Sequence, residues 1–289
     1  MNYFASILLT VLMFGMGLGL SLSDFGKVFS LPKAALMGLT GQLILLPALG
    51  FTLCYSLGLT GAVAIGIMLL TLCPGGVLSN MFTLLARGDL ALSVTMTSIS
   101  SLITVFSLPF FLNISMLFFN DQSIHISLPF VKTASQMMLI TVLPVSLGML
   151  VLHHAPNLAM RSKKWVRLGC SVFLPILIAG ILMQNKGAWF GQFVQLGALT
   201  VLLNILSILL GYGLGRLAQL ESKQVRTLSI EVGAQNAMLG VTIAISPFLL
   251  NDANIAVIPS IYGITMVIIL WFYSIIMNRF NNENVFVRT

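Results

Sequence analysis

The segment "LSIEVGAQNAMLG" (Leu228–Gly240) places a carboxylate, Glu231, inside a stretch of sequence that is apolar for long enough to cross a membrane. A charged side chain in a membrane span is costly and usually functional. Gly233 and the amide pair Gln235 and Asn236 follow it at once. The segment therefore predicts an interrupted transmembrane helix, and it raises the question of what neutralises the buried carboxylate.

The composition of the whole chain is that of an α-helical membrane protein. Of its 289 residues, 58% are hydrophobic and only 7% are charged, and the mean hydropathy is +1.03. Soluble globular chains contain about 25% charged residues. The apolar runs are also about twice as long as the roughly ten-residue strands of an outer-membrane barrel. We therefore expect an all-α membrane protein.

Runs of about 20 apolar residues predict nine transmembrane helices, which together make a single transmembrane domain over residues 1–289. They lie near 3–20, 34–57, 62–86, 90–119, 129–152, 168–184, 190–215, 227–250 and 254–278. The first run lacks a basic n-region and a convincing cleavage site, so we expect a retained helix rather than a signal peptide.

The basic residues fall almost entirely on one side of this predicted topology. With the N-terminus outside, the outer segments contain only Lys132 and Lys186. The inner segments contain Lys27, Lys33, Arg87, Arg161, Lys163, Lys164, Arg167, Arg216, Lys223, Arg226, Arg279 and Arg288. The positive-inside rule then predicts a multi-pass protein of the cell inner (plasma) membrane, with its N-terminus out and its C-terminus in. The net charge of +7 is explained in this way and does not indicate nucleic-acid binding.

A second interruption is predicted in "LCPGGVLSN" (Leu72–Asn80), because proline and paired glycines free backbone groups that lipid cannot satisfy. The two interrupted helices are the third from the start and the second from the end. If the chain is two inverted repeats, the first lacking one helix, the interruptions occupy matching positions and mark the site of a secondary transporter. Asn80 and Asn236 each lie on the order of 10–15 Å from the cytoplasmic face, so we expect the two broken helices to cross.

Hydroxyl residues form one face of the predicted helix 90–119, at spacings of four and three. They are Ser93, Thr97, Ser100, Thr104 and Ser107. Such stripes commonly serve close helix packing or bond to their own helix, and this interpretation stays open for the stripe as a whole. The first two members are close in sequence to the loop that joins this helix to Ser79 and Asn80.

The polar side chains predicted near the crossing supply only oxygen ligands, which hard cations prefer. They are Gln42, Ser79, Asn80, Ser93, Thr97, Glu231 and Gln235. Because no basic residue lies well inside a span, we expect Na⁺ to neutralise Glu231. A permanently protonated carboxyl group is the structural alternative, and a proton-coupled carrier of an organic anion is the functional one. The half-helices that start near Leu78 and Gln235 direct positive dipole ends at the crossing, which favours an organic anion as co-substrate.

An enzyme is not expected. No Asp or His lies well within a span, so the facing aspartates, Ser–His pair or HExxH motif of an intramembrane enzyme are missing. Cys54, Cys73 and Cys170 lie singly in apolar runs, without metal or redox spacing.

The chain resembles the bile acid:sodium symporter family over nearly its whole length. The resemblance is densest in "FGMGLGLSLSDF", "GQLILLP", "CPGGVLSNMFTLLARGDLALSVTMTSIS" and "LSIEVGAQN". It implies a bacterial member in which a core domain, helices near 34–119 and 190–278, holds the crossing. A panel domain, helices near 3–20, 129–152 and 168–184, would rock against it. The implied activity is alternating-access symport of two Na⁺ with one organic anion, a bile-acid-like or pantoate-like carboxylate.

The resemblance also implies site residues. One sodium site maps onto Ser79, Asn80, Ser93, Thr97 and Glu231. The second maps onto Gln42, Glu231, Gln235 and the backbone carbonyls of Val232 and Ala234. Asn236, Val77 and Leu78 are implied to face the substrate, and Val77 stands where many relatives have a hydroxyl residue. Nine helices with the N-terminus outside is the arrangement of mammalian members, whereas ten-helix bacterial members have an additional first helix.

Overall fold

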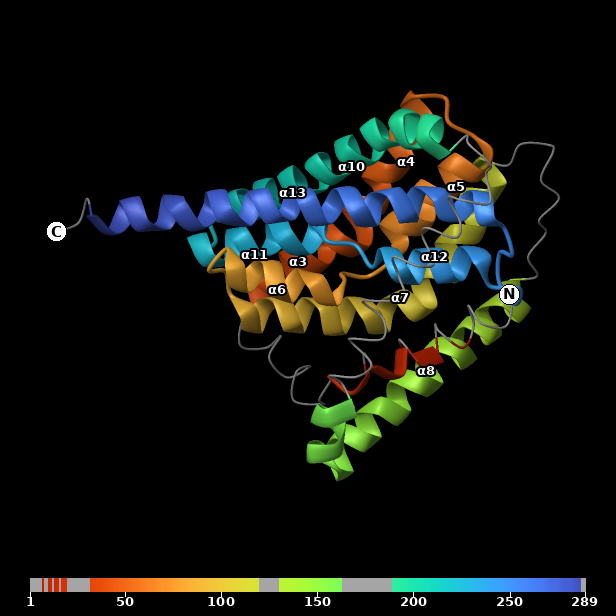
Figure 1. Cartoon of the computed structure of the whole chain (residues 1–289), viewed down its shortest axis with the longest axis horizontal. Coiled ribbons are helices and arrows are strands. Elements are labelled where there is room, and N and C mark those ends of the chain that lie inside the picture. The colour runs from red at the N-terminus through yellow and green to blue at the C-terminus, as the bar shows by residue number, and fades with distance from the viewer. Residues whose placement is uncertain are drawn as a thin grey trace.

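The computed structural model of the chain describes residues 7, 10–11, 13–15, 17–19, 32–119, 130–162 and 189–286. This part of the chain is helical apart from short connections, and it contains no β-strand. Figure 1 shows the helices, which in chain order are α3 (Pro32–Thr40), the π-helical turn η2 (Gly41–Leu45), α4 (Leu46–Ser56), α5 (Gly61–Leu72), α6 (Val77–Leu85), α7 (Leu90–Phe119), α8 (Phe130–His154), α10 (Trp189–Leu217), α11 (Ser222–Gly233), α12 (Ala237–Ile245) and α13 (Ala253–Phe286).

Four stretches of described helix are long and apolar enough to cross a membrane without interruption. They are Pro32–Ser56, Leu90–Phe119, Val194–Leu217 and Ala253–Arg279. Seven of the nine predicted spans coincide with described helices. The predicted span 168–184 lies outside the described residues, and 3–20 is described only in part. The total of nine therefore stays a prediction.

The start of α11 differs from the predicted boundary at residue 227. The helix begins at Ser222, where Glu221 and Gln224 form a reciprocal capping box. The apolar content of a segment indicates which of its residues lie in lipid. The helix itself continues through polar residues until its terminal backbone groups are capped. The same reason explains why α13 extends to Phe286, beyond the predicted end at 278.

The two interrupted helices occupy the interior of the helix bundle. Figure 1 shows α6 and α11 beside α13, while α8 runs along the edge of the bundle and packs on α7. Ten of the twelve residues of α5 are buried, and most of α11 and all but the last residue of α12 are buried. A helix that is enclosed on all sides is apolar on all sides. The polar residues that remain in these helices therefore face other parts of the protein.

Both predicted interruptions occur, and they lie against each other. The linker between α5 and α6 and the linker between α11 and α12 pair in antiparallel fashion at Gly75 and Gln235. The Gly76 N–H donates to the Ala234 carbonyl over 3.0 Å, and the Asn236 N–H donates to the Pro74 carbonyl over 3.0 Å. An unpaired backbone group at membrane depth costs several kcal/mol. Each linker therefore supplies hydrogen-bond partners for backbone groups of the other linker.

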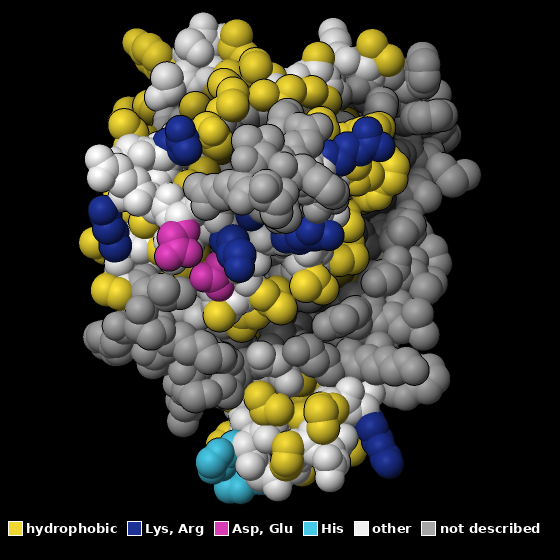
Figure 2. Space-filling model, turned by 90° about the vertical axis from the view of Figure 1, so that its left-hand side faces the viewer, with side chains coloured by type: hydrophobic (Ala, Val, Ile, Leu, Met, Phe, Trp, Pro, Cys, Tyr) yellow, Lys and Arg dark blue, Asp and Glu magenta, His cyan; other side chains and the backbone are white. Residues whose placement is uncertain are grey.

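One end of the molecule carries the loops that were predicted to face inward. The α6–α7 and α10–α11 connections lie at this end (Figure 1), with Arg87, Arg216 and Lys223 in or beside them. Figure 2 shows Lys and Arg side chains gathered on this end among apolar surface. The two loops thus lie on a common side, as the predicted topology requires.

Candidate functional site

Glu231 lies at the centre of the crossing, with 1% of its surface exposed. The Ser79 hydroxyl, from α6, lies 2.6 Å from its Oε1. From α7, the Thr97 hydroxyl lies 3.0 Å from Oε2, and the Ser93 hydroxyl also donates to Oε1. Three hydroxyl groups from two other helices therefore converge on one carboxylate.

A second layer of polar groups supports these hydroxyls. The Ser93 Oγ lies 2.9 Å from Asn80 Oδ1, and the Thr83 hydroxyl donates to Ser93 Oγ over 3.3 Å. Thr83 was not singled out from the sequence. Its position one helical turn after Ser79 is the signal that identifies it, because residues four apart share a face of α6.

The carboxylate has hydroxyl partners but no basic partner among the described residues. The described residues also hold no cluster of three His, Cys, Asp or Glu side chains. Carboxylate, hydroxyl and amide oxygens are ligands for a hard cation rather than for zinc or copper. The arrangement suits a small hard cation, or a proton shared with the carboxyl group.

Gly75 permits this arrangement by its lack of a side chain. A Cβ atom at this position would lie 2.7 Å from Glu231 Oε2. Such a separation is shorter than a carbon–oxygen contact allows, so a side chain at this position would displace either the carboxylate or the α5–α6 linker. The "PGG" sequence thus has two functions, since it interrupts the helix and makes room for Glu231.

The residues predicted for a second cation site form a hydrogen-bonded chain on the neighbouring side of the crossing. The Gln42 amide group donates to Gln235 Oε1 over 2.8 Å and to the Cys73 carbonyl over 3.1 Å. The Gln235 amide group donates to the Val232 carbonyl over 2.8 Å. The Ala234 carbonyl accepts from the opposite linker. All five predicted groups therefore lie at the crossing. The Ala234 carbonyl is held there by the backbone pairing of the two linkers and not by the chain of amide side chains.

Gln42 reaches this chain from the π-helical turn η2, which the sequence did not predict. The wide turn occupies Gly41–Leu45, and Gln42 within it is 3% exposed. Single π-turns inside α-helices often occur at functional sites, where they redirect one side chain.

The hydroxyl stripe on α7 divides into two parts. Ser93 and Thr97 contact Glu231, whereas the Ser100 hydroxyl donates to the Thr97 carbonyl of its own helix over 3.2 Å. The packing interpretation therefore applies to Ser100. The Thr104 hydroxyl is buried and has no hydrogen-bond partner among the described residues.

The three residues implied to face the substrate lie at the starts of the two half-helices. Asn236 is the N-cap of α12, and its side chain accepts from the Leu239 N–H over 3.0 Å. Val77 begins α6, and its side chain lies outside the description. Leu78 follows it and is 40% exposed.

Two further polar side chains contact the second interruption and were missed in the sequence. Asn204, from α10, and Tyr262, from α13, each donate to the Gly233 carbonyl over 2.8 Å. A single Asn or Tyr in a long apolar helix is more often a packing residue, so no local pattern distinguishes these two.

Comparison with known proteins places the chain among sodium-dependent transporters. A family model described as "Sodium Bile acid symporter family" matches residues 6–192. The "Uncharacterized sodium-dependent transporter YocS" of Bacillus subtilis is 27% identical over 250 residues, which are 85% of this chain and 74% of that protein.

Plant and animal proteins are similar to the chain to the same degree. The "Probable sodium/metabolite cotransporter BASS1, chloroplastic" of Oryza sativa is 32% identical over 236 residues, 82% of this chain and 57% of that protein. The "Ileal sodium/bile acid cotransporter" of Homo sapiens is 30% identical over 265 residues, 90% of this chain and 74% of that protein. The chain thus spans a little over half of the chloroplastic relative and about three quarters of the other two.

Proposed function

The chain belongs to the Sodium Bile acid symporter family, a family of sodium-coupled transporters rather than enzymes, and on this premise we propose that it carries an organic anion across the membrane together with Na⁺. The observation that supports the proposal most directly is the environment of Glu231. Its carboxylate is buried among three hydroxyl groups and has no basic partner in the described part of the chain. A bound Na⁺ supplies the missing positive charge.

We assign the first cation to the carboxylate and the hydroxyl groups around it. Its ligands are Ser79, Asn80, Ser93, Thr97 and Glu231. The second cation is assigned to Gln42, Glu231, Gln235 and the carbonyls of Val232 and Ala234. Because Glu231 contributes to both sets, binding of one ion affects the other. Oxygen-only ligand sets and unwound backbone carbonyls support these assignments.

The anion is assigned to the starts of the two half-helices. Gly76, the N-cap of α6, has no side chain that satisfies the first N–H groups, and the helix dipole favours negative charge there. Asn236, Val77 and Leu78 border this place. An apolar side chain at Leu78, 40% exposed, favours a carboxylate with an apolar part. The names of the relatives, bile acid and metabolite cotransporters, agree with this class of substrate.

Alternating access is assigned to a panel that moves against a core. Two observations support the division. Among the labelled helices α8 packs mainly on α7, at the edge of the bundle (Figure 1), and Gly17 of the first predicted span lies directly against Val145 of α8. Ile140 and Val145 of α8 pack against the apolar cluster that contains Leu239 and Ile243 of α12. The core holds the crossing, and the two inverted repeats supply one broken helix each.

The driving force is adequate for concentrative uptake. A tenfold Na⁺ gradient supplies about 1.4 kcal/mol per ion, and a membrane potential of about 100 mV adds roughly 2.3 kcal/mol per net charge moved. Two Na⁺ with one monoanion therefore provide about 5 kcal/mol, which corresponds to between three and four decades of accumulation. We place this activity in the plasma membrane with the N-terminus outside, on the strength of the basic loops.

The proposal is tested by the melting temperature of the purified protein in NaCl and in KCl of equal ionic strength, at pH 6 and pH 8. A ligand that binds only the folded state raises the melting temperature with its concentration. We expect Na⁺ to stabilise the wild type and Glu231→Gln to lose most of this effect. Glu221→Gln, which removes an exposed carboxylate at the start of the same helix, is the matched control and keeps the response.

Two outcomes contradict the proposal. If Na⁺ and K⁺ act alike while pH changes the wild type but not Glu231→Gln, the carboxylate is a proton carrier. If proteoliposomes take up no bile acid, pantoate or other carboxylate in response to an imposed Na⁺ gradient, the chain is not a sodium symporter of these anions.

A further inference from the structure

The end of α11 leaves backbone carbonyls without helical partners. In a continuous helix the Gly233 carbonyl would accept from the N–H of residue 237. Here the Ala237 N–H bonds to the Gln235 carbonyl instead. The last carbonyls of a helix must find other donors, above all at membrane depth. The donors that bind the Gly233 carbonyl therefore determine the backbone conformation at the interruption.

The Gly233 carbonyl is bound by two side chains from two different helices. The Tyr262 hydroxyl donates to it over 2.8 Å, and the Asn204 amide group donates to it over 2.8 Å. The Asn204 amide also donates to the Tyr262 oxygen over 2.8 Å. The three groups form a closed triangle, and both side chains are fully buried.

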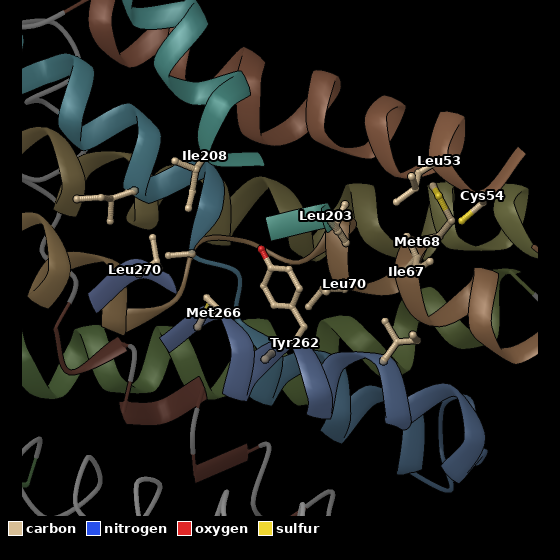
Figure 3. Packing of buried hydrophobic residues seen from close by; sticks show 14 of the residues in the cluster. Leu53, Cys54, Ile67, Met68, Leu70, Leu203, Ile208, Tyr262, Met266 and Leu270 are labelled. Carbon is tan, nitrogen blue, oxygen red and sulfur yellow. The ribbon is translucent and has the colours of Figure 1, made fainter. Parts of the chain in front are cut away.

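The surroundings allow this triangle little freedom. Figure 3 shows Tyr262 extending from α13, with its hydroxyl directed away from that helix and its ring near Leu203, Leu70 and Met266. A Cβ atom on Gly233 would lie 2.5 Å from Ile208 Cγ1, so α10 lies directly on the glycine. The backbone at the end of α11 is therefore contacted by both α10 and α13.

Neither donor is itself part of the proposed cation sites. The neighbouring Val232 carbonyl is bound by Gln235, a proposed ligand, and the Ala234 carbonyl is bound by the opposite linker. Of these three carbonyls, only that of Gly233 is held by side chains from outside both ligand sets. Side chains of α10 and α13 thus fix the position of the Gly233 carbonyl, whether or not an ion is bound.

We propose that Tyr262 and Asn204 are positioning residues for cation binding. By fixing the Gly233 carbonyl they hold the backbone turn that presents the Glu231 carboxylate and the Val232 and Ala234 carbonyls to Na⁺. They act through the backbone and do not touch the ion. This inference rests on the proposed sodium coupling, because it assigns the residues that prepare that site.

The experiment measures the melting temperature of the detergent-purified full-length protein as NaCl replaces KCl at constant ionic strength. It compares Tyr262→Phe, which removes only the hydroxyl, with Asn204→Leu and with the double variant. Ser260→Ala is the matched control, because Ser260 is fully buried on α13 and, among the described residues, its hydroxyl bonds only to the Ala256 carbonyl of its own helix. The readouts are the melting temperature without Na⁺ and the Na⁺ concentration for half-maximal stabilisation.

We expect Tyr262→Phe to raise the half-maximal Na⁺ concentration roughly three- to tenfold, the range that the loss of one buried hydrogen bond predicts. Asn204→Leu shifts it in the same direction. Because the two side chains act on one carbonyl, the double variant shifts it by less than the product of the single effects. Ser260→Ala leaves the half-maximal concentration unchanged.

A merely structural role gives a different result. In that case Tyr262→Phe and Asn204→Leu lower the melting temperature equally with and without Na⁺, the half-maximal concentration stays that of the wild type, and the proposal is overturned. If Tyr262→Phe does not yield folded protein, Asn204→Leu decides by the same readout. A wild type that does not respond to Na⁺ contradicts the proposed function itself, which separates the two failures.

Discussion

The Ser79 hydroxyl and the Glu231 carboxylate lie 2.6 Å apart, although 152 residues separate them in the chain. Ser79 is in the first turn of α6 and Glu231 is in the last turn of α11. Each residue follows or precedes a helix interruption, and the pairing of Gly75 with Gln235 brings the two interruptions together. The contact therefore exists only because two distant helices are broken at the same place.

This relationship joins the backbone of the fold to its chemistry. In an unbroken helix the carbonyls near Glu231 would be consumed by intrahelical hydrogen bonds. The interruption releases them, and the paired linker brings a hydroxyl from another helix to the carboxylate. An oxygen-rich site thus forms in a region where the lipid outside offers no polar partner.

Removal of an α7 hydroxyl group that contacts Glu231 should weaken Na⁺ binding. Removal of a hydroxyl group beyond Thr97 on the same helix should not. Thr97→Val keeps the shape of the side chain but removes an oxygen 3.0 Å from Glu231 Oε2. We expect the half-maximal Na⁺ concentration in thermal titrations to rise roughly tenfold, which corresponds to about 1.4 kcal/mol. Ser100→Ala, one turn later, removes a hydroxyl that, in the described part of the chain, bonds only to its own helix. An equal shift in both variants would show that the effect is one of helix packing.

Gln42→Leu should reduce the cooperativity of Na⁺ binding. Gln42 belongs to the second ligand set and not to the first, and its amide group donates to Gln235 and to the Cys73 carbonyl. We expect positive coupling between the two ions, so that the Hill coefficient of the wild type lies above 1 and does not exceed the number of sites. We expect it to fall to about 1 in Gln42→Leu. Gln195→Leu, at an exposed position of α10, is the control. A coefficient that stays at the wild-type value in Gln42→Leu would remove this residue from the second site.

The sequence predicts those features of the fold that are local. Apolar runs give the seven spans that coincide with described helices, and the "PGG" of the α5–α6 linker gives an interruption. A single acidic residue in an apolar run identifies Glu231. Each of these signals is contained in a few neighbouring residues, so each is visible before the helices are arranged in space.

The remaining features depend on how the helices pack. Asn204 and Tyr262 are 58 residues apart, and they contact each other and the Gly233 carbonyl because α10 and α13 pack on the end of α11. Thr83 joins the site because α6 turns that face toward Ser93. The π-helical turn that carries Gln42 arises in a run that reads as ordinary helix. Apolarity and spacing are the same whether or not these contacts form, so neither could have predicted them.

Gly75→Ala should abolish Na⁺-dependent stabilisation. The added Cβ would lie 2.7 Å from Glu231 Oε2, so the carboxylate or the linker has to move. We expect a lower melting temperature without Na⁺ and no response to Na⁺, measured as above. Gly213→Ala is the control, because a Cβ there has no neighbour within 4 Å. Since alanine favours helix, this control should be neutral or more stable by up to about 1 kcal/mol. A wild-type Na⁺ response in Gly75→Ala would mean that the carboxylate is free to move aside.

The orientation in the membrane can be tested with single cysteines. The native Cys54 and Cys73 are buried, and all three native cysteines are replaced by alanine before a new one is introduced. Thr60→Cys lies at the exposed start of α5, on the side with few basic residues, and Glu221→Cys lies at the exposed start of α11, on the basic side. Positively charged loops stay in the cytoplasm. A membrane-impermeant thiol reagent should therefore label Thr60→Cys in intact cells and Glu221→Cys only after permeabilisation. The reverse pattern would contradict the predicted topology, in which the N-terminus lies outside and the basic loops lie inside.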